Sequence, residues 1–305
     1  MRSWFLPFIA FLTILTCAAL LAFLLIENRQ ARPDPAVLIG AGDISVCGQD
    51  GDDKTAQLLR QLVRRHPRAV IFTAGDNSQT MGQMSEYIQC FEPAWGSFKN
   101  RIRPSPGNHD WFTEQGADYF TYFGQAAGDF GLGYYSFDHG NWHIVSLNSN
   151  CESAGCGEDS AQALWLRDDL EKSPQACTLL YWHHPIRSSG KVPVDLSGEV
   201  FWQIASDFGA EIVINGHDHH YERFVPLDRD GIASPDSGIR SFIVGTGGAW
   251  LFDLDKPLPI TATRDNSTYG VILFLLYPDR YEWEFIPVKG GGYTDKGSGV
   301  CNQQI

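Results

Sequence analysis

The sequence predicts an α/β domain built from packed sheets with helices on the outside, and three observations support this class. The runs 37–43 (VLIGAGD) and 69–76 (AVIFTAGD) both have the pattern of a buried strand that ends in Gly-Asp. The segment 55–66 between them has a helical pattern, so the three elements form a βαβ unit with parallel strands. The C-terminal third is mostly strand, and no repeat or low-complexity tract divides the chain. One catalytic domain over 36–305 is therefore expected.

Strands and helices continue to alternate beyond this unit, and strands dominate the tail. Helices are predicted near 160–172 and 200–208. Apolar runs bounded by turn residues predict strands at 133–138, 142–148, 178–184, 210–215, 239–245, 269–276 and 281–287. Ligand sites in open α/β sheets gather at the carboxyl ends of strands, so the aspartates that follow the first two strands are candidate site residues.

The N-terminal segment 4–26 has no charged residue, and the linker that follows it contains two prolines. As a helix this segment would be about 35 Å long, enough to cross a hydrocarbon core of about 30 Å. A cleaved signal peptide is the alternative, but its apolar region is usually about 7–15 residues long and ends in small residues, which are not evident after Ala22. We therefore favour a membrane anchor and linker over 1–35, outside the globular fold.

Composition and charge narrow the class of partner. The chain has 305 residues, 43% of them apolar, and a formal net charge of −13. A surface that binds phosphate backbones needs clustered Lys and Arg, and no basic run occurs, so nucleic acid is not expected as the main partner. An acidic protein can still act on a small phosphate ester if bound metal ions supply the local positive charge.

The cysteines bear on the compartment. Of the seven, Cys17 lies in the apolar N-terminal segment. The remaining even set has no CxxC spacing, which argues against a zinc ribbon or a thioredoxin-type centre: Cys47, Cys90, Cys151, Cys156, Cys177 and Cys301. Disulfides persist outside the cytosol, so this set suits a periplasmic or extracellular domain, membrane-anchored or secreted. Buried free thiols are the alternative, and the sequence does not choose a pairing.

Five short polar segments, which we call the polar blocks, occur where a strand should give way to a loop. Each alone is weak, because Gly-Asp is a common turn and a histidine near a strand end is usually a structural hydrogen-bonding residue. Of the nine histidines, however, five lie in three of these blocks and His220 adjoins the last. Carboxylates mixed with imidazoles suit Fe, Mn or Zn. The blocks are Gly42-Asp43, Gly75-Asp76-Asn77, Gly107-Asn108-His109-Asp110, His183-His184-Pro185 and Gly216-His217-Asp218-His219.

The blocks contain what a two-metal site requires. Two ions held about 3.5–4 Å apart need a bridging ligand, and a carboxylate can offer oxygen to both, which makes Asp76 the candidate bridge. Residues two apart in an extended backbone point to the same side, so His217 and His219 can give one imidazole to each ion. Asp218 should then point away from the ions, either behind the ligands or at the surface.

In this order the blocks GD, GDN, GNHD, HHP and GHDH resemble those of the calcineurin-like metallophosphoesterases, in particular the branch that contains the purple acid phosphatases. The resemblance covers roughly residues 37–248. It implies a four-layer αββα sandwich of two mixed sheets flanked by helices. It also implies a dinuclear metal centre, with one ion bound by Asp43, Asp76 and His219 and the other by Asp76, Asn108, His183 and His217.

Two positions depart from that family pattern. The purple acid phosphatase branch has a tyrosine three residues after the bridging aspartate, where this chain has Gln79. Many other members have Asp-x-His at the first block, where this chain has Asp43-Ile44-Ser45. Gln79, a water molecule or another side chain would complete the first metal site, and the colour of a tyrosinate–iron centre is not expected. In HHP the family's ligand lies two residues before the proline, which favours His183, while His184 either contacts substrate or packs.

The expected chemistry is in-line attack on phosphorus by a metal-bound hydroxide, with both ions neutralising charge on the phosphoryl oxygens. His109 is the candidate general acid, because it adjoins Asn108 and an imidazolium can protonate the leaving oxygen. Asp110 either orients His109 or caps a turn. The glycine-rich loop 245–248 either lets a substrate approach closely or only turns the chain.

Three functions are compatible with these motifs. A phosphomonoesterase is favoured, and a phosphodiesterase acting on nucleotides or lipid head groups is the alternative. A metal-binding surface protein without turnover is the third. The complete ligand set beside His109 favours an enzyme, whereas Gln79 is the feature that favours a binding protein.

Overall fold

The computed structural model describes residues 34–302, and residues 35–302 belong to one compact unit. Within the described residues, no helix has both the length and the apolar character needed to cross a membrane. The segment 4–26, on which the prediction of an anchor or a signal peptide depends, lies outside these residues.

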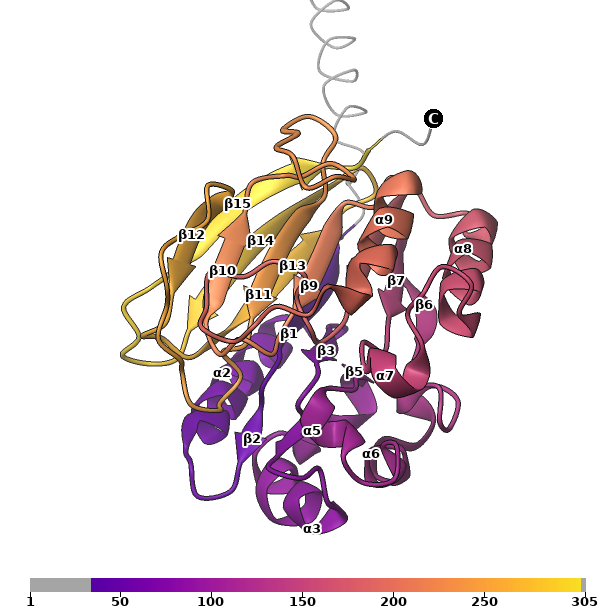
Figure 1. Cartoon of the computed structure of the whole chain (residues 1–305). Helices are drawn as coiled ribbons and strands as arrows, with labels where there is room; N and C mark the ends of the chain where they lie inside the picture. Colours follow the sequence, from indigo (N-terminus) through magenta and orange to yellow (C-terminus); the bar gives the residue numbers. More distant parts are fainter. Residues whose placement is uncertain (1–33, 303–305) are drawn as a thin grey trace, which may run out of the picture. The chain divides into compact units, whose positions relative to one another are not determined.

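A six-stranded mixed sheet carries the first three polar blocks (Figure 1). Its strands are β1 (Ala36–Ala41), β3 (Val70–Ala74), β5 (Ile102–Ser105), β13 (Gly270–Leu276), β14 (Arg280–Pro287) and β15 (Asp295–Val300). They lie in the order β15-β14-β13-β1-β3-β5, with β1, β3 and β5 parallel to one another and the other pairs antiparallel. Helix α2 (Gly51–Arg65) connects β1 to β3, so the predicted βαβ unit is confirmed.

A seven-stranded mixed sheet carries the other two polar blocks. Its strands are β6 (Tyr135–His139), β7 (Trp142–Ser146), β8 (Cys177–Tyr181), β9 (Ile212–Asn215), β10 (Tyr221–Phe224), β11 (Arg240–Val244) and β12 (Thr261–Asp265). The order is β12-β10-β11-β9-β8-β7-β6, and the central strands β7, β8, β9 and β11 are parallel.

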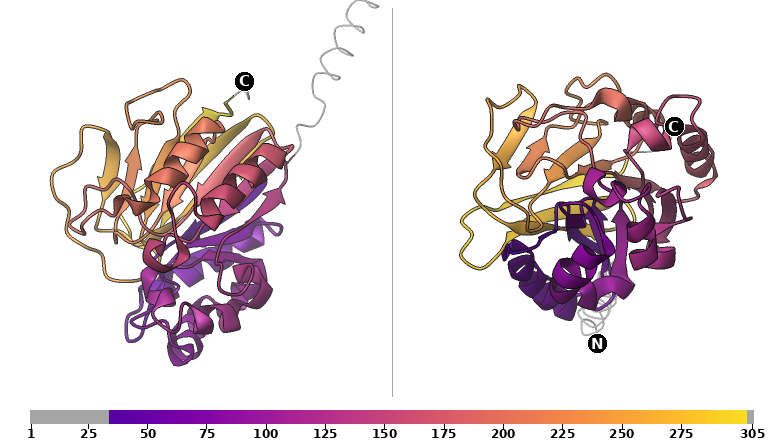
Figure 2. Two further views of the ribbon diagram at one scale, coloured as in Figure 1. Left: turned by 45° about the vertical axis from the view of Figure 1, so that its right-hand side comes forward. Right: turned by 60° about the horizontal axis from the view of Figure 1, so that its bottom comes forward.

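Both faces of the seven-stranded sheet are buried, as alternation along its strands shows. On β8, Leu179 packs with the core that also contains residues of the six-stranded sheet, and Leu180 packs on the opposite face. That opposite face is covered by α8 (Ala161–Lys172) and α9 (Glu199–Asp207), which lie side by side in Figure 2. Helix α2 buries Ala56 and Leu59 against the core of the other sheet. The predicted four-layer αββα sandwich is therefore confirmed.

Short elements fill the connections. The segments 45–46 and 78–79 form a small parallel sheet of β2 (Ser45–Val46) and β4 (Ser78–Gln79). Helical turns between β4 and β6 bury an aromatic cluster that includes Tyr87, Phe91 and Tyr122. The turns are α3 (Met84–Glu86), η1 (Tyr87–Phe91), α4 (Glu92–Ala94), η2 (Gly96–Arg101), α5 (Asn108–Trp111), α6 (Ala117–Phe123) and η3 (Gly124–Ala127), and further on α7 (Cys151–Ala154) and η4 (Leu196–Gly198).

The even set of cysteines forms three disulfides, so the alternative of buried free thiols is wrong. The pairs are Cys47–Cys90, Cys151–Cys156 and Cys177–Cys301.

Candidate metal centre

Five parallel strands deliver the polar blocks to one place. Asp43 follows β1, Asp76 follows β3, and Asn108 begins the turn after β5. On the seven-stranded sheet, His183 follows β8 and His217 follows β9. The carboxyl ends of parallel strands lie at the same end of a sheet, and here the corresponding ends of the two sheets face each other. Side chains distant in sequence therefore converge.

The backbone of this site is strained where the candidate ligands lie. Asp43, Asp76 and His217 have positive φ values of 60°, 49° and 69°, a region that residues with a Cβ rarely adopt. Each residue turns sharply out of a strand, which aims its side chain into the space between the sheets. Residues in such conformations concentrate at functional sites, where the surrounding structure holds them in place.

The glycines of the polar blocks allow the close approach of these segments. A Cβ on Gly107 would lie 2.1 Å from Oδ1 of Asp76. A Cβ on Gly75, whose φ is 81°, would lie 2.4 Å from Nδ1 of His183. Any side chain at either position would displace a candidate ligand.

The two buried carboxylates make few hydrogen bonds with their outer oxygens. Oδ2 of Asp43 accepts the backbone N–H of His217 at 2.9 Å, while Oδ1 makes no hydrogen bond and lies 3.2 Å from Nε2 of His219. Oδ1 of Asp76 accepts the backbone N–H of His109 at 2.9 Å, and Oδ2 lies 3.3 Å from Nε2 of His183. One oxygen of each carboxylate is thus fixed by the backbone, and the other faces an imidazole nitrogen.

Two imidazoles are oriented by backbone carbonyls. Nδ1 of His183 donates to the carbonyl of Ala74 at 2.8 Å, and Nδ1 of His219 donates to the carbonyl of Trp250 at 2.6 Å. Each bond leaves Nε2 as the atom that faces the carboxylates. Metal-ligating histidines are usually held in this way, because the second hydrogen bond fixes both the tautomer and the ring orientation.

The donor atoms fit a metal ion. One ligand atom each of Asp43, Asp76 and His183 lies within 4.8 Å of the others, and all three side chains are buried. Around Nε2 of His183, Oδ1 of Asn108 lies at 3.1 Å and Nδ1 of His217 at 3.3 Å. Carbonyl and carboxylate oxygens and imidazole nitrogens that converge on one point, away from water, require a positive charge between them.

The electrostatics of the imidazoles agree with this requirement. Burial lowers the pKa of His183, but the carboxylates of Asp76 and Asp43 outweigh it and raise the pKa to about 9. Burial, together with the charge on His183, lowers the pKa of His217 to about 2. Burial also lowers the pKa of His219, but the carboxylate of Asp43 outweighs it and raises that pKa. The cluster therefore favours positive charge beside its carboxylates and keeps His217 neutral, with its lone pair available. A metal ion can take the place of that proton.

The polar side chains beside the candidate ligands have different surroundings. Gln79, at the position where the family pattern has tyrosine, is buried and donates from Nε2 to Oδ2 of Asp76 at 3.3 Å. Nδ1 of His109 donates to the carbonyl of Thr80 at 2.5 Å, and its Nε2 lies 3.8 Å from Oδ2 of Asp76. Nδ1 of His184 lies 2.8 Å from the hydroxyl of Ser149, and burial lowers the pKa of His184 to about 4. One ring nitrogen of His184 also lies within 4.8 Å of a ring nitrogen each of His183 and His217, so these three residues could hold a metal ion.

Asp110 and Asp218 point away from the cluster. Asp110 is buried and accepts hydrogen bonds from the backbone N–H groups of Gly107 and Asn77 and from the hydroxyl of Tyr87. These are the contacts of a turn-capping carboxylate. Asp218 is also buried, so it is no surface residue, and it accepts a hydrogen bond from Ser188.

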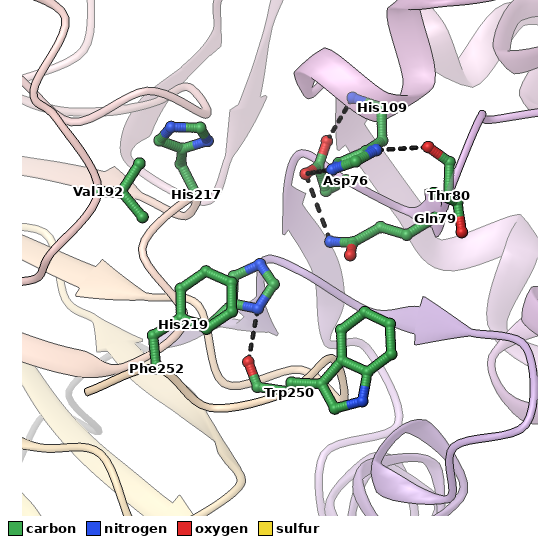
Figure 3. Close-up of a pocket in the computed structure, with 9 residues that line it drawn as sticks. All are labelled: Asp76, Gln79, Thr80, His109, Val192, His217, His219, Trp250 and Phe252. Atoms are coloured by element: carbon green, nitrogen blue, oxygen red, sulfur yellow. Dashed lines mark hydrogen bonds and ion pairs between the residues drawn. The ribbon is translucent and has the colours of Figure 1, made fainter.

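A pocket with a volume of about 200 Å³ opens over the cluster (Figure 3). Sequence reasoning missed part of its lining, because the signal lies in no polar block. The missed residues are Thr80, Val192, Trp250 and Phe252, and the predicted ones are Asp76, Gln79, His109, His217 and His219. For Trp250 a signal existed, since it lies two residues beyond the glycine-rich loop 245–248.

Comparison with known proteins places this site in a family. Residues 34–221 match the family described as calcineurin-like phosphoesterase. Purple acid phosphatase 15 of Arabidopsis thaliana is 26% identical over 220 residues, which are 60% of this chain and 41% of that protein. A 3',5'-cyclic-nucleotide phosphodiesterase of Nostoc sp. is 34% identical over 90 residues, which are 28% of this chain and 34% of that protein. The chain thus spans less than half the length of these relatives.

The fold agrees with that match. The structure of purple acid phosphatase PPD1 from yellow lupin (Lupinus luteus) superimposes with a TM-score of 0.75 at 17% sequence identity, over 88% of this chain and 55% of that one. The predicted resemblance is confirmed by the sequence match and by this fold. The chain belongs to the calcineurin-like phosphoesterase family, and within it is similar to the purple acid phosphatases.

Proposed function

We propose that the chain is a metal-dependent phosphoric ester hydrolase with a dinuclear centre, and that its preferred substrates are phosphomonoesters. The observation that carries this proposal is the convergence of buried carboxylate oxygens and oriented imidazole nitrogens on one point below an open pocket. The similarity to a purple acid phosphatase supports phosphomonoesters as the preferred substrates.

The proposed ligands form two sets that share Asp76. One ion would be held by Asp76 with Asp43 and His219, whose Oδ1 and Nε2 lie 3.2 Å apart. The other would be held by Asp76 with Asn108, His183 and His217, and the short distances around Nε2 of His183 support this set. The chemistry that two metal ions supply when bound there is charge neutralisation on the phosphoryl oxygens and activation of a water molecule. Fe, Mn and Zn suit this donor set.

His109 is the proposed proton donor to the leaving oxygen. Its Nδ1–H is engaged by the carbonyl of Thr80, so the ring is fixed and Nε2 is the atom that faces the pocket beside Asp76. A proton held on Nε2 would pass to the ester oxygen as the P–O bond breaks. Gln79 would keep the Asp76 carboxylate in place through its amide hydrogen bond.

A phosphodiesterase is the second candidate, and a specific observation favours it. The stretch of 90 residues that is 34% identical to a cyclic-nucleotide phosphodiesterase makes diesters of nucleotides a reasonable alternative substrate class, with diesters of lipid head groups beside them. A metal-binding surface protein without turnover is the third candidate, and Gln79 is the residue that favours it.

We also propose that the domain works outside the cytosol, in the periplasm or the extracellular space. The three disulfides support this location, because disulfides persist in oxidising compartments. Residues 4–26 would tether the domain to a membrane or, if cleaved, direct its secretion.

The test combines elemental analysis with a panel of mono- and diesters assayed across pH. The purified protein should contain about two metal ions and hydrolyse an aryl phosphate. Asp76→Ala should lose metal and reduce hydrolysis to background, because it removes the bridging carboxylate. Asp253→Ala is the matched control, since this aspartate is exposed and pairs with Lys191 at the surface. If the metal-loaded protein left every ester intact, the proposal of a hydrolase would be contradicted, and the proposal of a metal-binding surface protein would be supported.

A further inference from the structure

The segment Ala249–Phe252, which follows β11 and the glycine-rich loop, is fixed directly on the candidate ligands. The backbone N–H of Ala249 donates to the carbonyl of Asp43 at 2.9 Å. The carbonyl of Trp250 accepts from His219 at 2.6 Å, and the N–H of Phe252 donates to the carbonyl of His219 at 2.9 Å. The side chains of this segment therefore have a defined place beside the proposed metal centre.

The glycine-rich loop explains how the segment reaches this place. A Cβ on Gly247 would lie 2.5 Å from the carbonyl of Gly42, and a Cβ on Gly248 would lie 2.3 Å from the backbone nitrogen of Asp52. The loop thus packs backbone against backbone, with no space for side chains. These contacts hold the loop against the backbone of Gly42 and Asp52, and the first side chain beyond it that lines the pocket is Trp250.

Three apolar side chains line the pocket, and we call them the apolar rim: Val192, Trp250 and Phe252. The Phe252 ring stacks on the His219 imidazole, with centroids 4.0 Å apart and planes at 10°. The indole of Trp250 remains 48% exposed although its backbone is held on both sides. In Figure 3 Val192 lies beside His217 and the Phe252 ring lies beside His219, whereas the indole of Trp250 lies below Asp76 and Gln79, apart from Val192. A large aromatic group that is rigidly held and left open at a pocket is typical of a ligand contact.

The other side chains that line the pocket further restrict the chemical class of the ligand. Within residues 34–302, the side chains that line the pocket include no Lys or Arg. Phosphate charge would therefore be balanced by the metal ions and by His109 when protonated, and a substrate with additional anionic groups would find no Lys or Arg beside them. The organic part of the substrate would meet apolar surface instead.

Resting on the proposed hydrolase activity, we propose that the apolar rim is the subsite for the leaving group, and that it selects phosphomonoesters of planar aromatic alcohols or of nucleosides. The leaving group stacks on the indole of Trp250 while the phosphoryl group occupies the metal side of the pocket. In the reaction, a P–O bond to water forms, the P–O bond to the leaving oxygen breaks, and that oxygen takes a proton. The products are inorganic phosphate and a phenol or a nucleoside.

The experiment compares kcat/KM for phenyl phosphate, a nucleoside 5'-monophosphate and glycerol phosphate in wild type, Trp250→Ala and Trp250→Phe. Trp250→Ala should lower the aromatic-to-glycerol ratio of kcat/KM about tenfold, within the range for loss of one base–aromatic stacking contact. Trp250→Phe should recover most of the ratio. Phe130→Ala, which removes an aromatic ring that is 71% exposed and does not line the pocket, should leave the ratio unchanged. A fall for phenyl phosphate alone would assign the subsite to aryl esters, and a fall for the nucleotide alone would assign it to nucleosides.

Equilibrium binding supplies a readout without turnover. Calorimetric titration of the metal-loaded protein should show that phenylphosphonate binds more tightly than ethylphosphonate, and that Trp250→Ala removes most of this difference. Active enzyme whose aromatic-to-glycerol ratio and phosphonate selectivity are unchanged in Trp250→Ala would overturn the subsite and leave the hydrolase standing. Protein that hydrolyses no ester would instead overturn the hydrolase.

Discussion

His143 on β7 lies between two carboxylates and is the residue through which we expect pH to act on stability. Its Nδ1 lies 2.9 Å from Asp138 on β6, and its Nε2 lies 2.8 Å from Asp169 on α8. Burial lowers the pKa of His143, but these two partners outweigh it and raise the pKa above the usual value of about 6.5. The stabilisation is then fully present below pH 6.5 and is lost as pH rises through the folded-state pKa.

The substitution His143→Gln should therefore lower the free energy of unfolding by about 1.5 kcal/mol at pH 6, the lower end for hydrogen bonds to charged groups, and by less at higher pH. Denaturant unfolding at several pH values measures this difference. His139→Gln is the matched control on the neighbouring strand β6, because burial lowers the pKa of His139 and its effect must have the opposite sign. The His139 contribution is lost as pH falls through the depressed pKa. Equal pH dependence in both variants would contradict the assignment.

At the same scale, the sequence predicted the centre of the site better than its rim. The candidate ligands could be found because a glycine followed by carboxylate or imidazole residues recurs after strand ends. This short pattern accompanies the sharp turn that the backbone makes where each strand ends. Thr80, Val192 and Phe252 had no such signal, because their places depend on how three separate loops fold over the pocket. Thr80, for example, contributes its carbonyl to His109, and any residue type supplies a carbonyl.

At the scale of elements, the strands that could be predicted were mostly the central ones. The runs on β1, β3, β8 and β9 are apolar because both faces of each strand are buried. The missed strands β5, β12 and β15 are sheet edges, and β10 is a short strand beside one edge. β5 contains Pro104, which an edge tolerates. β15 has the sequence DKGSGV, and its Gly297 lies under the ring of Trp283 on β14, so the apolar surface comes from the neighbouring strand.

The disulfide Cys177–Cys301 joins two elements that belong to different sheets. Cys177 opens β8, and Cys301 follows β15 at the far edge of the other sheet. The bond closes a loop with a sequence separation of 124, whereas Cys151–Cys156 closes one of 5. In the chain-entropy account, stabilisation grows with the logarithm of loop length, to about 5 kcal/mol for the first bond and about 2 kcal/mol for the second.

We therefore expect the double serine variant of Cys177 and Cys301 to lose considerably more unfolding free energy than that of Cys151 and Cys156. Urea unfolding of the two variants beside the wild type provides the measurement. The second variant is the matched control, because it also removes one disulfide and replaces two cysteine sulfur atoms by hydroxyl groups. A smaller loss for the long loop than for the short one would show that restriction of the unfolded chain is not the main contribution.

At the scale of the whole molecule, the two sheets bring their carboxyl-end loops together at a cost that the domain must offset. Asp43 and Asp76 are at most 1% exposed, and they face each other among imidazoles of which two, His183 and His219, have a pKa that these carboxylates raise. Buried like charges destabilise a fold unless positive charge lies between them. A metal ion supplies more of that charge than a proton does, so metal binding and folding should be coupled.

Removing metal should then lower the thermal stability of the whole domain, independently of any substrate. If free metal stands at about 1,000 times its dissociation constant, the loss is about 4 kcal/mol, or a fall in Tm of the order of 8 °C for a domain of this size. The measurement is a thermal unfolding scan before and after treatment with a chelator, with recovery on adding metal back. Before treatment, the Tm of Asp76→Ala should already differ from that of the wild type, because the bridging ligand is gone. The chelator should then change the Tm of this variant little. If the Tm of wild type and of Asp76→Ala responded equally to the chelator, the chelator would act at some other part of the molecule. The convergence of the two sheets at Asp76 would then have to be explained without a metal.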